Sequence, residues 1–167
     1  MDSDPTLNIF KSALLLERRG QAFYRHVATQ SEHAAVKRFF DGMAAEEQLH
    51  IDVLTRQFNT YRDTGALAGD ETLPAADSGV ADTVLSSEIR EQVAAAGFEA
   101  AAIQAAISME ERATALYRER SRSASLPAEK AVYEWLADWE QGHLNTLVEL
   151  DRDITQKIWY DNQFWPF

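Results

Sequence analysis

The sequence predicts an all-α protein, a four-helix bundle made of two antiparallel hairpins joined by a long crossover. Apolar residues recur at helical spacing along nearly the whole chain, and the alternation typical of strands is missing. Short polar turns separate the helices within each expected pair, whereas a long stretch with several glycines lies between the pairs. The 167 residues are expected to form a single domain, 1–167.

The first hairpin is expected at 5–28 and 32–62. Pro5 suits the first turn of a helix, and the turn near 29–32 is short enough to make the two helices antiparallel neighbours. Each helix carries an apolar stripe that polar side chains interrupt. The inward-facing residues are Phe10, Ala13, Leu14, Glu17, Gly20, Tyr24 and Val27 on the first helix, and Phe39, Phe40, Met43, Glu47, His50, Leu54 and Phe58 on the second.

The crossover is expected at 63–82, where helix breakers gather. About 20 residues, at about 3.3 Å each, can span the roughly 38 Å length of a 25-residue helix. The second hairpin is expected at 84–121 and 126–155, followed by an aromatic tail at 156–167. Its inward-facing residues are Ile103, Ala106, Ile107, Glu110, Ala113 and Tyr117, then Tyr133, Leu136, Glu140, His143, Leu147 and Leu150.

Composition excludes several kinds of function. The net charge of -11 argues against nucleic acid or anionic membranes as partners, because both attract basic surfaces. The absence of cysteine excludes disulfides, thiolate zinc sites and iron–sulfur clusters within the chain. The sequence contains no run of about 18 apolar residues, so no membrane-spanning segment is predicted. The acidic N-terminus lacks the features of a signal peptide, so a cytoplasmic location is predicted.

An internal repeat carries the chemistry. A shift of 93 residues, taken without gaps, places the first half of the chain on the second. The matched pairs are Glu17 with Glu110, Tyr24 with Tyr117, Glu47 with Glu140, and His50 with His143. A single shift satisfies every pair, which indicates two hairpins of similar construction facing one another.

Helical geometry gives the spacing a meaning. Glu47 and His50 are three residues apart, so both project from one helix face and can bind one ion, and Glu140 with His143 repeats this arrangement. Carboxylates in apolar stripes are costly to bury unless a positive charge meets them. Four glutamates would balance two divalent ions. Without metal, the crowded carboxylates are expected to have raised pKa values.

One glutamate from each of two helices and Glu-x-x-His from each of the other two is the ligand pattern of ferritin-like di-iron and di-manganese bundles. From about Thr6 to Ile154 the chain resembles that superfamily. Within it, the Glu-x-x-Gly/Ala-x-x-Phe/Leu-Tyr strings of the first and third helices are most similar to rubrerythrins that lack a rubredoxin module. The resemblance implies that the irons are bound by Glu17, Glu47, His50, Glu110, Glu140 and His143, with Tyr24 and Tyr117 close behind these ligands.

The implied function is that of a non-haem di-iron oxidoreductase that reduces hydrogen peroxide or oxidises Fe(II). Two iron ions are expected as cofactors, although manganese and zinc also suit oxygen and nitrogen ligands. Each Glu-x-x-His pair would hold one ion, with Glu17 and Glu110 completing or bridging the site. Peroxide or dioxygen, a separate electron donor and a second copy of the chain in a homodimer are the expected partners. Ala113 stands where rubrerythrins carry an additional carboxylate.

Three other functions stay open. Bacterioferritin-like iron storage uses a similar ligand set, but Gln48 replaces the methionine that binds haem there, so no haem is expected. A manganese catalase-like enzyme and a metal-free helical interaction module are the others. The repeat also sorts nearby polar residues: Glu46 matches Trp139 and is assigned to the surface or to a position behind the ligands. Glu111 is set aside as well, and both His26 and His33 are expected to be exposed.

Overall fold

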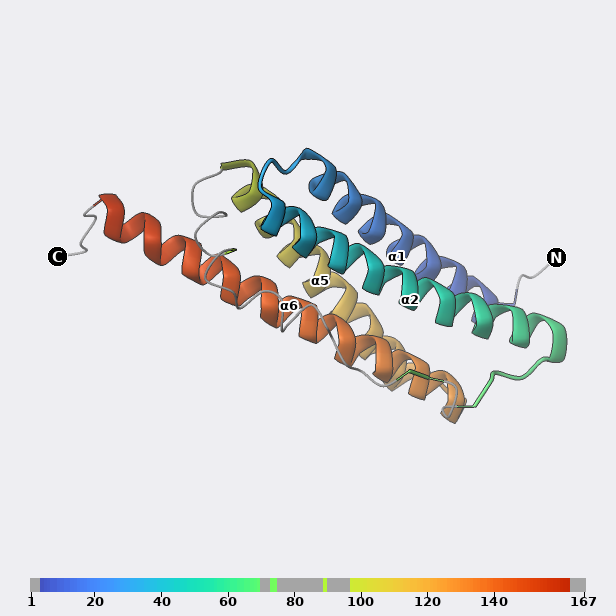
Figure 1. Ribbon diagram of the computed structural model, residues 1–167. Helices are drawn as coiled ribbons and strands as arrows, with labels where there is room; N and C mark the ends of the chain where they lie inside the picture. The colour runs from blue at the N-terminus through green and yellow to red at the C-terminus, as the bar shows by residue number, and fades with distance from the viewer. Residues whose placement is uncertain (1–3, 70–72, 75–88, 90–96, 163–167) are drawn as a thin grey trace.

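The computed structural model describes residues 4–69, 73–74, 89 and 97–162, except for the side chains of 157–159 and 161–162. These residues form four helices and contain no strand. The helices are α1 (Pro5–Gln30), α2 (Ala34–Thr64), α5 (Gly97–Ser123) and α6 (Pro127–Asn162). Two antiparallel pairs, α1 with α2 and α5 with α6, lie side by side in a bundle (Figure 1). The predicted all-α fold of paired helices is confirmed.

Local sequence signals account for the ends of the first two helices. The Asp4 carboxylate caps α1 by accepting hydrogen bonds from the backbone N–H groups of Thr6, at 2.8 Å, and Leu7, at 3.4 Å. Pro5 follows at a position where its missing N–H costs nothing. At the same end of the hairpin, α2 is followed by Gly65, whose φ of 73° lies in the left-handed region that glycine adopts without steric cost.

Several predicted boundaries differ from the observed ones. The fourth helix continues to Asn162 instead of ending at 155, so the first residues of the predicted aromatic tail are helical and Tyr160 projects into solvent. No glycine or proline interrupts this segment before Pro166, and aromatic residues can continue a helix when no breaker intervenes. Residues 163–167, most of the predicted crossover at 63–82, and 84–96 apart from Ile89 lie outside the described residues.

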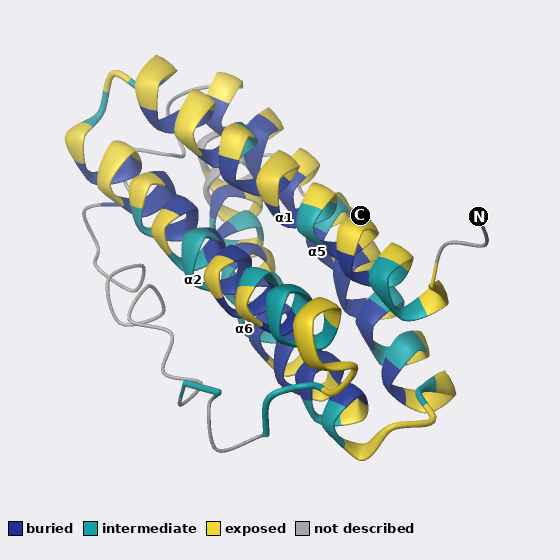
Figure 2. Ribbon diagram, turned by 90° about the vertical axis from the view of Figure 1, so that its right-hand side faces the viewer, coloured by how far each residue is buried: buried dark blue, intermediate teal, exposed yellow. Residues whose placement is uncertain are grey.

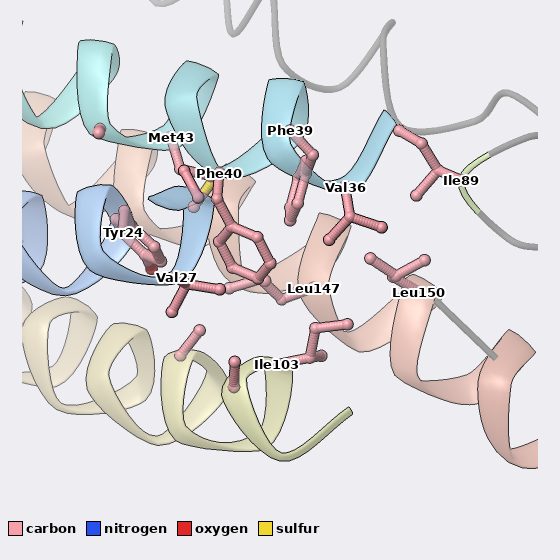
Figure 3. Packing of buried hydrophobic residues seen from close by; sticks show 14 of the residues in the cluster. Tyr24, Val27, Val36, Phe39, Phe40, Met43, Ile89, Ile103, Leu147 and Leu150 are labelled. Atoms are coloured by element: carbon pink, nitrogen blue, oxygen red, sulfur yellow. The ribbon is translucent and has the colours of Figure 1, made fainter. Parts of the chain in front are cut away.

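The end of α2 and the start of α5 lie at opposite ends of the bundle (Figure 1). Leu73 packs against a cluster that includes Phe10, and the indole N–H of Trp135 in α6 donates to the carbonyl of Pro74 at 2.8 Å. Ile89 packs near the far end of the bundle (Figure 3). Leu73 and Ile89, both from the segment that connects the two hairpins, therefore lie at opposite ends of the bundle.

Two apolar clusters fill the bundle, one on each side of its middle. Buried residues face the bundle axis and exposed ones face outward along all four helices (Figure 2). The Tyr24 cluster, near the α1–α2 turn, includes Val27, Val36, Phe39, Phe40, Met43, Ile103, Leu147 and Leu150 (Figure 3). The Tyr117 cluster, at the other end, includes Phe10, Leu54, Val132, Tyr133, Leu136, Trp135 and Trp139. Between the two clusters the inward-facing side chains of the four helices are polar.

Within the described part of the chain, no helix contains an apolar stretch of the length that a membrane crossing needs.

Candidate metal centre

Six polar side chains meet where the two apolar clusters adjoin. Each helix contributes at least one of them, and none is more than 3 % exposed. They are Glu17 from α1, Glu47 and His50 from α2, Glu110 from α5, and Glu140 and His143 from α6. All six were singled out by the repeat, and the structure brings all six together.

The six residues form two overlapping groups, each suited to one cation. Within each group the candidate ligand atoms all lie within 4.8 Å of one another. The groups are Glu17, Glu47, His50 and Glu140, and Glu47, Glu110, Glu140 and His143. Glu47 and Glu140 belong to both groups, whereas Glu17 and Glu110 each belong to one.

This sharing refines the ligand arrangement that the sequence suggested. Each group contains one Glu-x-x-His pair with the unshared glutamate of the same hairpin, and adds one glutamate from the opposite hairpin. The shared carboxylates are Glu47 and Glu140, and Glu17 and Glu110 complete one group each. A repeat alone shows which residues match, but only the bundle places Glu140 against His50, whose Nδ1 lies 3.0 Å from the Glu140 Oε1 atom.

Both imidazoles turn the same nitrogen toward the carboxylates. His50 Nδ1 lies 3.0 Å from Glu17 Oε2, and His143 Nδ1 lies 3.2 Å from Glu140 Oε2. A histidine that presents one nitrogen to a cation keeps its other nitrogen protonated and directed outward. The common orientation of the two rings suits two ions held among the carboxylates.

Two tyrosines cross the bundle to the carboxylates that are not shared. The Tyr24 hydroxyl donates a hydrogen bond to Glu110 Oε1, and the Tyr117 hydroxyl donates to Glu17 Oε1. Each bond therefore joins opposite hairpins, and the two bonds exchange places under the 93-residue shift. Burial and the neighbouring carboxylates, Glu110 for Tyr24 and Glu17 for Tyr117, raise the pKa of both tyrosines well above the usual value, so both remain hydrogen-bond donors.

The carboxylates do not all titrate alike. Burial, reinforced by the charge of Glu140, raises the pKa of Glu47 and Glu110 well above the usual value, as the sequence predicted for crowded carboxylates. Glu140 departs from that prediction. Burial opposes its ionisation, but the charges and hydrogen bonds of His50 and His143 outweigh burial and hold the pKa of Glu140 well below the usual value.

The surrounding carboxylates also change the pKa values of the two histidines. Burial lowers the pKa of His50, but Glu140 and the hydrogen bonds of the surrounding carboxylates more than offset this and raise it well above the usual value. The pKa of His143 is likewise raised well above the usual value, by hydrogen bonds to Glu140 and Glu46 acting against burial. Positive charge is thus favoured at both places where the carboxylates converge.

A small pocket of about 20 Å³ opens onto the centre between α1 and α5. Its lining consists of four matched pairs of the repeat: Leu16 with Met109, Glu17 with Glu110, Gly20 with Ala113, and Glu47 with Glu140. Half-buried Leu16 and Met109 lie on its solvent side. A pocket of this volume holds about one water-sized molecule, because a cavity needs roughly 10–15 Å³ to hold a single water.

Gly20 has a steric role that sequence reasoning missed. A Cβ atom at this position would lie 3.3 Å from the Glu47 Cδ atom, closer than ordinary van der Waals contact. The matching residue in the other half is Ala113, so both halves keep small residues beside the shared carboxylates. The pairing of glycine with alanine three residues after each of the matched glutamates Glu17 and Glu110 was the signal available in the sequence.

Glu46 and Trp139 are the other residues whose role the sequence left undefined. Glu46 Oε2 lies 2.6 Å from His143 Nε2 and accepts the Trp139 indole N–H at 3.0 Å. Of the two predicted placements for Glu46, surface or behind the ligands, the second is observed. Their matched positions in the repeat, directly before Glu47 and Glu140, were the available signal.

The remaining polar residues that the sequence analysis considered lie away from the centre. His26 is exposed, as predicted, and Glu111, which the repeat set aside as a ligand, is exposed too. His33 differs from its prediction, because it is half-buried at the position that precedes α2. It makes no side-chain capping hydrogen bond there.

Comparisons with protein-family models, curated proteins and solved structures return no match for this chain. The class of site therefore follows from fold and geometry alone. The chain is an all-helical protein of four paired helices with a buried cluster of glutamates and histidines that can hold a metal ion.

Proposed function

We propose that this protein is a non-haem di-iron oxidoreductase of rubrerythrin type, with a ferritin-like bundle, that reduces hydrogen peroxide or oxidises Fe(II) with it. The observation that carries the proposal is the pair of four-residue groups that share Glu47 and Glu140. Two cations held a few ångströms apart by shared carboxylates are what such a site requires. The crossover of a ferritin-like topology is part of the proposal, supported by Leu73 and Ile89 at opposite ends of the bundle.

The donor set fits iron. It consists of carboxylate oxygens and imidazole nitrogens without thiolates, a combination that suits iron, manganese and zinc. Four carboxylates would neutralise two divalent ions, which removes the cost of burying uncompensated charge. When bound, a pair of irons supplies two electrons, one from each ion, and peroxide needs two electrons and two protons to become two water molecules.

The protein groups would position the substrate and restrict its size. The pocket between Leu16 and Met109, at about 20 Å³, would suit a substrate as small as peroxide or dioxygen better than a larger organic molecule. Tyr24 and Tyr117 would hold the unshared carboxylates in place, because each donates a hydrogen bond across the bundle. The chain has no cysteine, so the proposal includes a separate electron donor that reduces the site after each turnover.

The test is a reaction of the loaded protein with peroxide. Anaerobic protein loaded with Fe(II) and mixed with hydrogen peroxide should change its visible spectrum rapidly, consuming one peroxide for every two Fe(II) ions. Glu47→Gln, which alters both groups, should abolish the rapid phase, whereas Glu111→Gln, an exposed glutamate, should leave it intact. Absence of reaction with either peroxide or dioxygen would remove the enzymatic proposal.

A further inference from the structure

The two candidate histidine ligands differ in what lies behind them. His143 Nε2 lies 2.6 Å from the Glu46 carboxylate. His50 Nε2 is buried and has no hydrogen-bond partner among the residues that the structure describes. Instead the His50 ring packs at steep angles against Trp135 and Trp139, with ring centroids 5.6 and 5.3 Å away.

The difference originates in a mismatch within the repeat. Glu46 and Trp139 occupy the same position in the two halves, each directly before a shared carboxylate. The repeat therefore places a carboxylate behind His143 and an indole behind His50. The two mismatched residues also contact each other, since the Trp139 N–H donates to the same Glu46 oxygen that lies nearest His143. Trp139 thus helps fix the Glu46 side chain in its position.

A carboxylate behind a histidine strengthens the histidine as a metal ligand. It accepts the outer N–H, fixes the tautomer and ring orientation, and makes the metal-binding nitrogen more basic. Loss of such a partner typically lowers metal affinity about 10–100-fold. The outer nitrogen of His50 has no such acceptor among the described residues and lies in a ring packed beside two indoles, and a buried donor without a hydrogen bond is unfavourable.

Resting on the proposed function, we infer that the two metal positions are unequal and that Glu46 makes the His143 position the tighter one. Metal then fills the group of Glu47, Glu110, Glu140 and His143 first. The group of Glu17, Glu47, His50 and Glu140 fills second. The asymmetry is built into the protein and needs no difference between the ions.

Two variants isolate the two positions in the full-length protein. His50→Ala leaves the four residues of the His143 group unchanged, and His143→Ala leaves those of the His50 group unchanged. Each would be titrated with Co(II) alone and followed by calorimetry and by visible absorption, which reports ligand geometry. The unaltered protein should bind Co(II) in two steps. His50→Ala should retain an affinity near that of the first step, and His143→Ala one at least tenfold weaker.

The role of Glu46 is tested in both backgrounds. Glu46→Gln should lower Co(II) affinity about 10–100-fold in the His50→Ala protein and change it less than about threefold in the His143→Ala protein. Glu111→Gln removes the same charge next to Glu110 but on the exposed face, and should change neither. Trp139→Phe should weaken the His143 position by less than Glu46→Gln does, because it removes one donor to Glu46.

The possible results separate this inference from the proposed function. Two Co(II) ions of equal affinity, or an equal loss on Glu46→Gln in both backgrounds, would overturn the inference and leave a two-metal protein. No Co(II) binding by the unaltered, folded protein would overturn both. Circular dichroism of each variant without metal establishes that the helices are intact.

Discussion

The two halves of the molecule carry the same ligands in different surroundings. Glu17, Glu47 and His50 match their counterparts in the second half, and the cross-bundle tyrosine bonds match as well. The surroundings differ, among other positions, at Glu46 opposite Trp139 and at Gly20 opposite Ala113. What the halves share determines that a centre exists, and where they differ determines how its two positions behave.

The contrast extends to the apolar clusters. Tyr24 stacks with Phe40 at a centroid distance of 6.1 Å, and Tyr117 stacks with Tyr133 at the same distance. Phe40 and Tyr133 are counterparts in the repeat. The rings are placed alike, but the buried hydroxyl of Tyr133 has no hydrogen-bond partner among the described residues. Packing geometry is thus maintained between the halves more closely than polar complementarity is.

The largest expected effect distinguishes shared from unshared carboxylates. Glu47→Gln or Glu140→Gln should weaken both metal positions by more than the roughly 10–100-fold cost of losing an outer partner, because each residue belongs to both groups. Glu17→Gln or Glu110→Gln should weaken one position and leave the other nearly unchanged. Metal content after equilibrium dialysis measures this. Equal losses for all four variants would contradict the sharing.

The pH dependence of stability should reverse when metal binds. Four groups have a pKa that is raised on folding: His50, His143, Glu47 and Glu110. Each stabilises the metal-free protein fully only at a pH below its pKa in the unfolded chain. For the histidines that value is about 6.5, and their contribution is lost as pH rises through the folded value. Glu140, with its lowered pKa, contributes the opposite dependence, losing stability as pH falls through its folded value.

The metal-free protein, measured with a chelator present, should therefore unfold at a lower temperature as the pH rises above about 6.5. Metal ions displace the imidazole protons, so the stabilisation by metal should grow over the same range. Thermal unfolding followed by circular dichroism, with chelator and with Mn(II), measures both trends. His50→Ala and His143→Ala should each remove part of the difference. Parallel trends with and without metal would show that these protons and the ions do not compete.

Much of the centre could be predicted from the sequence because helices convert spacing into position. Three-residue spacing places Glu47 and His50 on one face, and the single shift identifies Glu140 and His143 without any structure. The sharing of Glu47 and Glu140, by contrast, depends on how the hairpins face each other. The lowered pKa of Glu140 follows from its contact with both histidines, which no local pattern encodes.

The tyrosine bonds test whether the halves are equivalent where their sequences match. Tyr24→Phe and Tyr117→Phe should each lower the free energy of unfolding by about 1.5–3 kcal/mol, the usual contribution of a hydrogen bond to a charged group. The two losses should be similar because the bonds are related by the repeat. Urea unfolding of the metal-loaded proteins gives the values. A loss in only one variant would show that the equivalence is confined to the ligands.

The smallest expected effect concerns the glycine and alanine that differ between the halves. Gly20→Ala favours the helix by up to about 1 kcal/mol. The metal-free protein, in which Glu47 can shift away from the new methyl group, should therefore be slightly stabilised. Metal affinity should fall several-fold, because the new methyl group displaces a shared ligand. Ala113→Gly should show the reverse pattern, with stability lowered by about 1 kcal/mol and metal affinity unchanged. Unchanged metal affinity in Gly20→Ala would contradict the steric role of this glycine.

Elemental analysis of the purified protein tests the central claim most directly. The protein prepared without added metal, then dialysed anaerobically against excess Fe(II) and afterwards against metal-free buffer, should retain two metal ions per chain. The Glu47→Ala, Glu140→Ala double variant, shown by circular dichroism to remain helical, should retain none. Substoichiometric metal in the unaltered protein, or the same metal content in both proteins, would contradict a metal centre at the meeting point of the four helices.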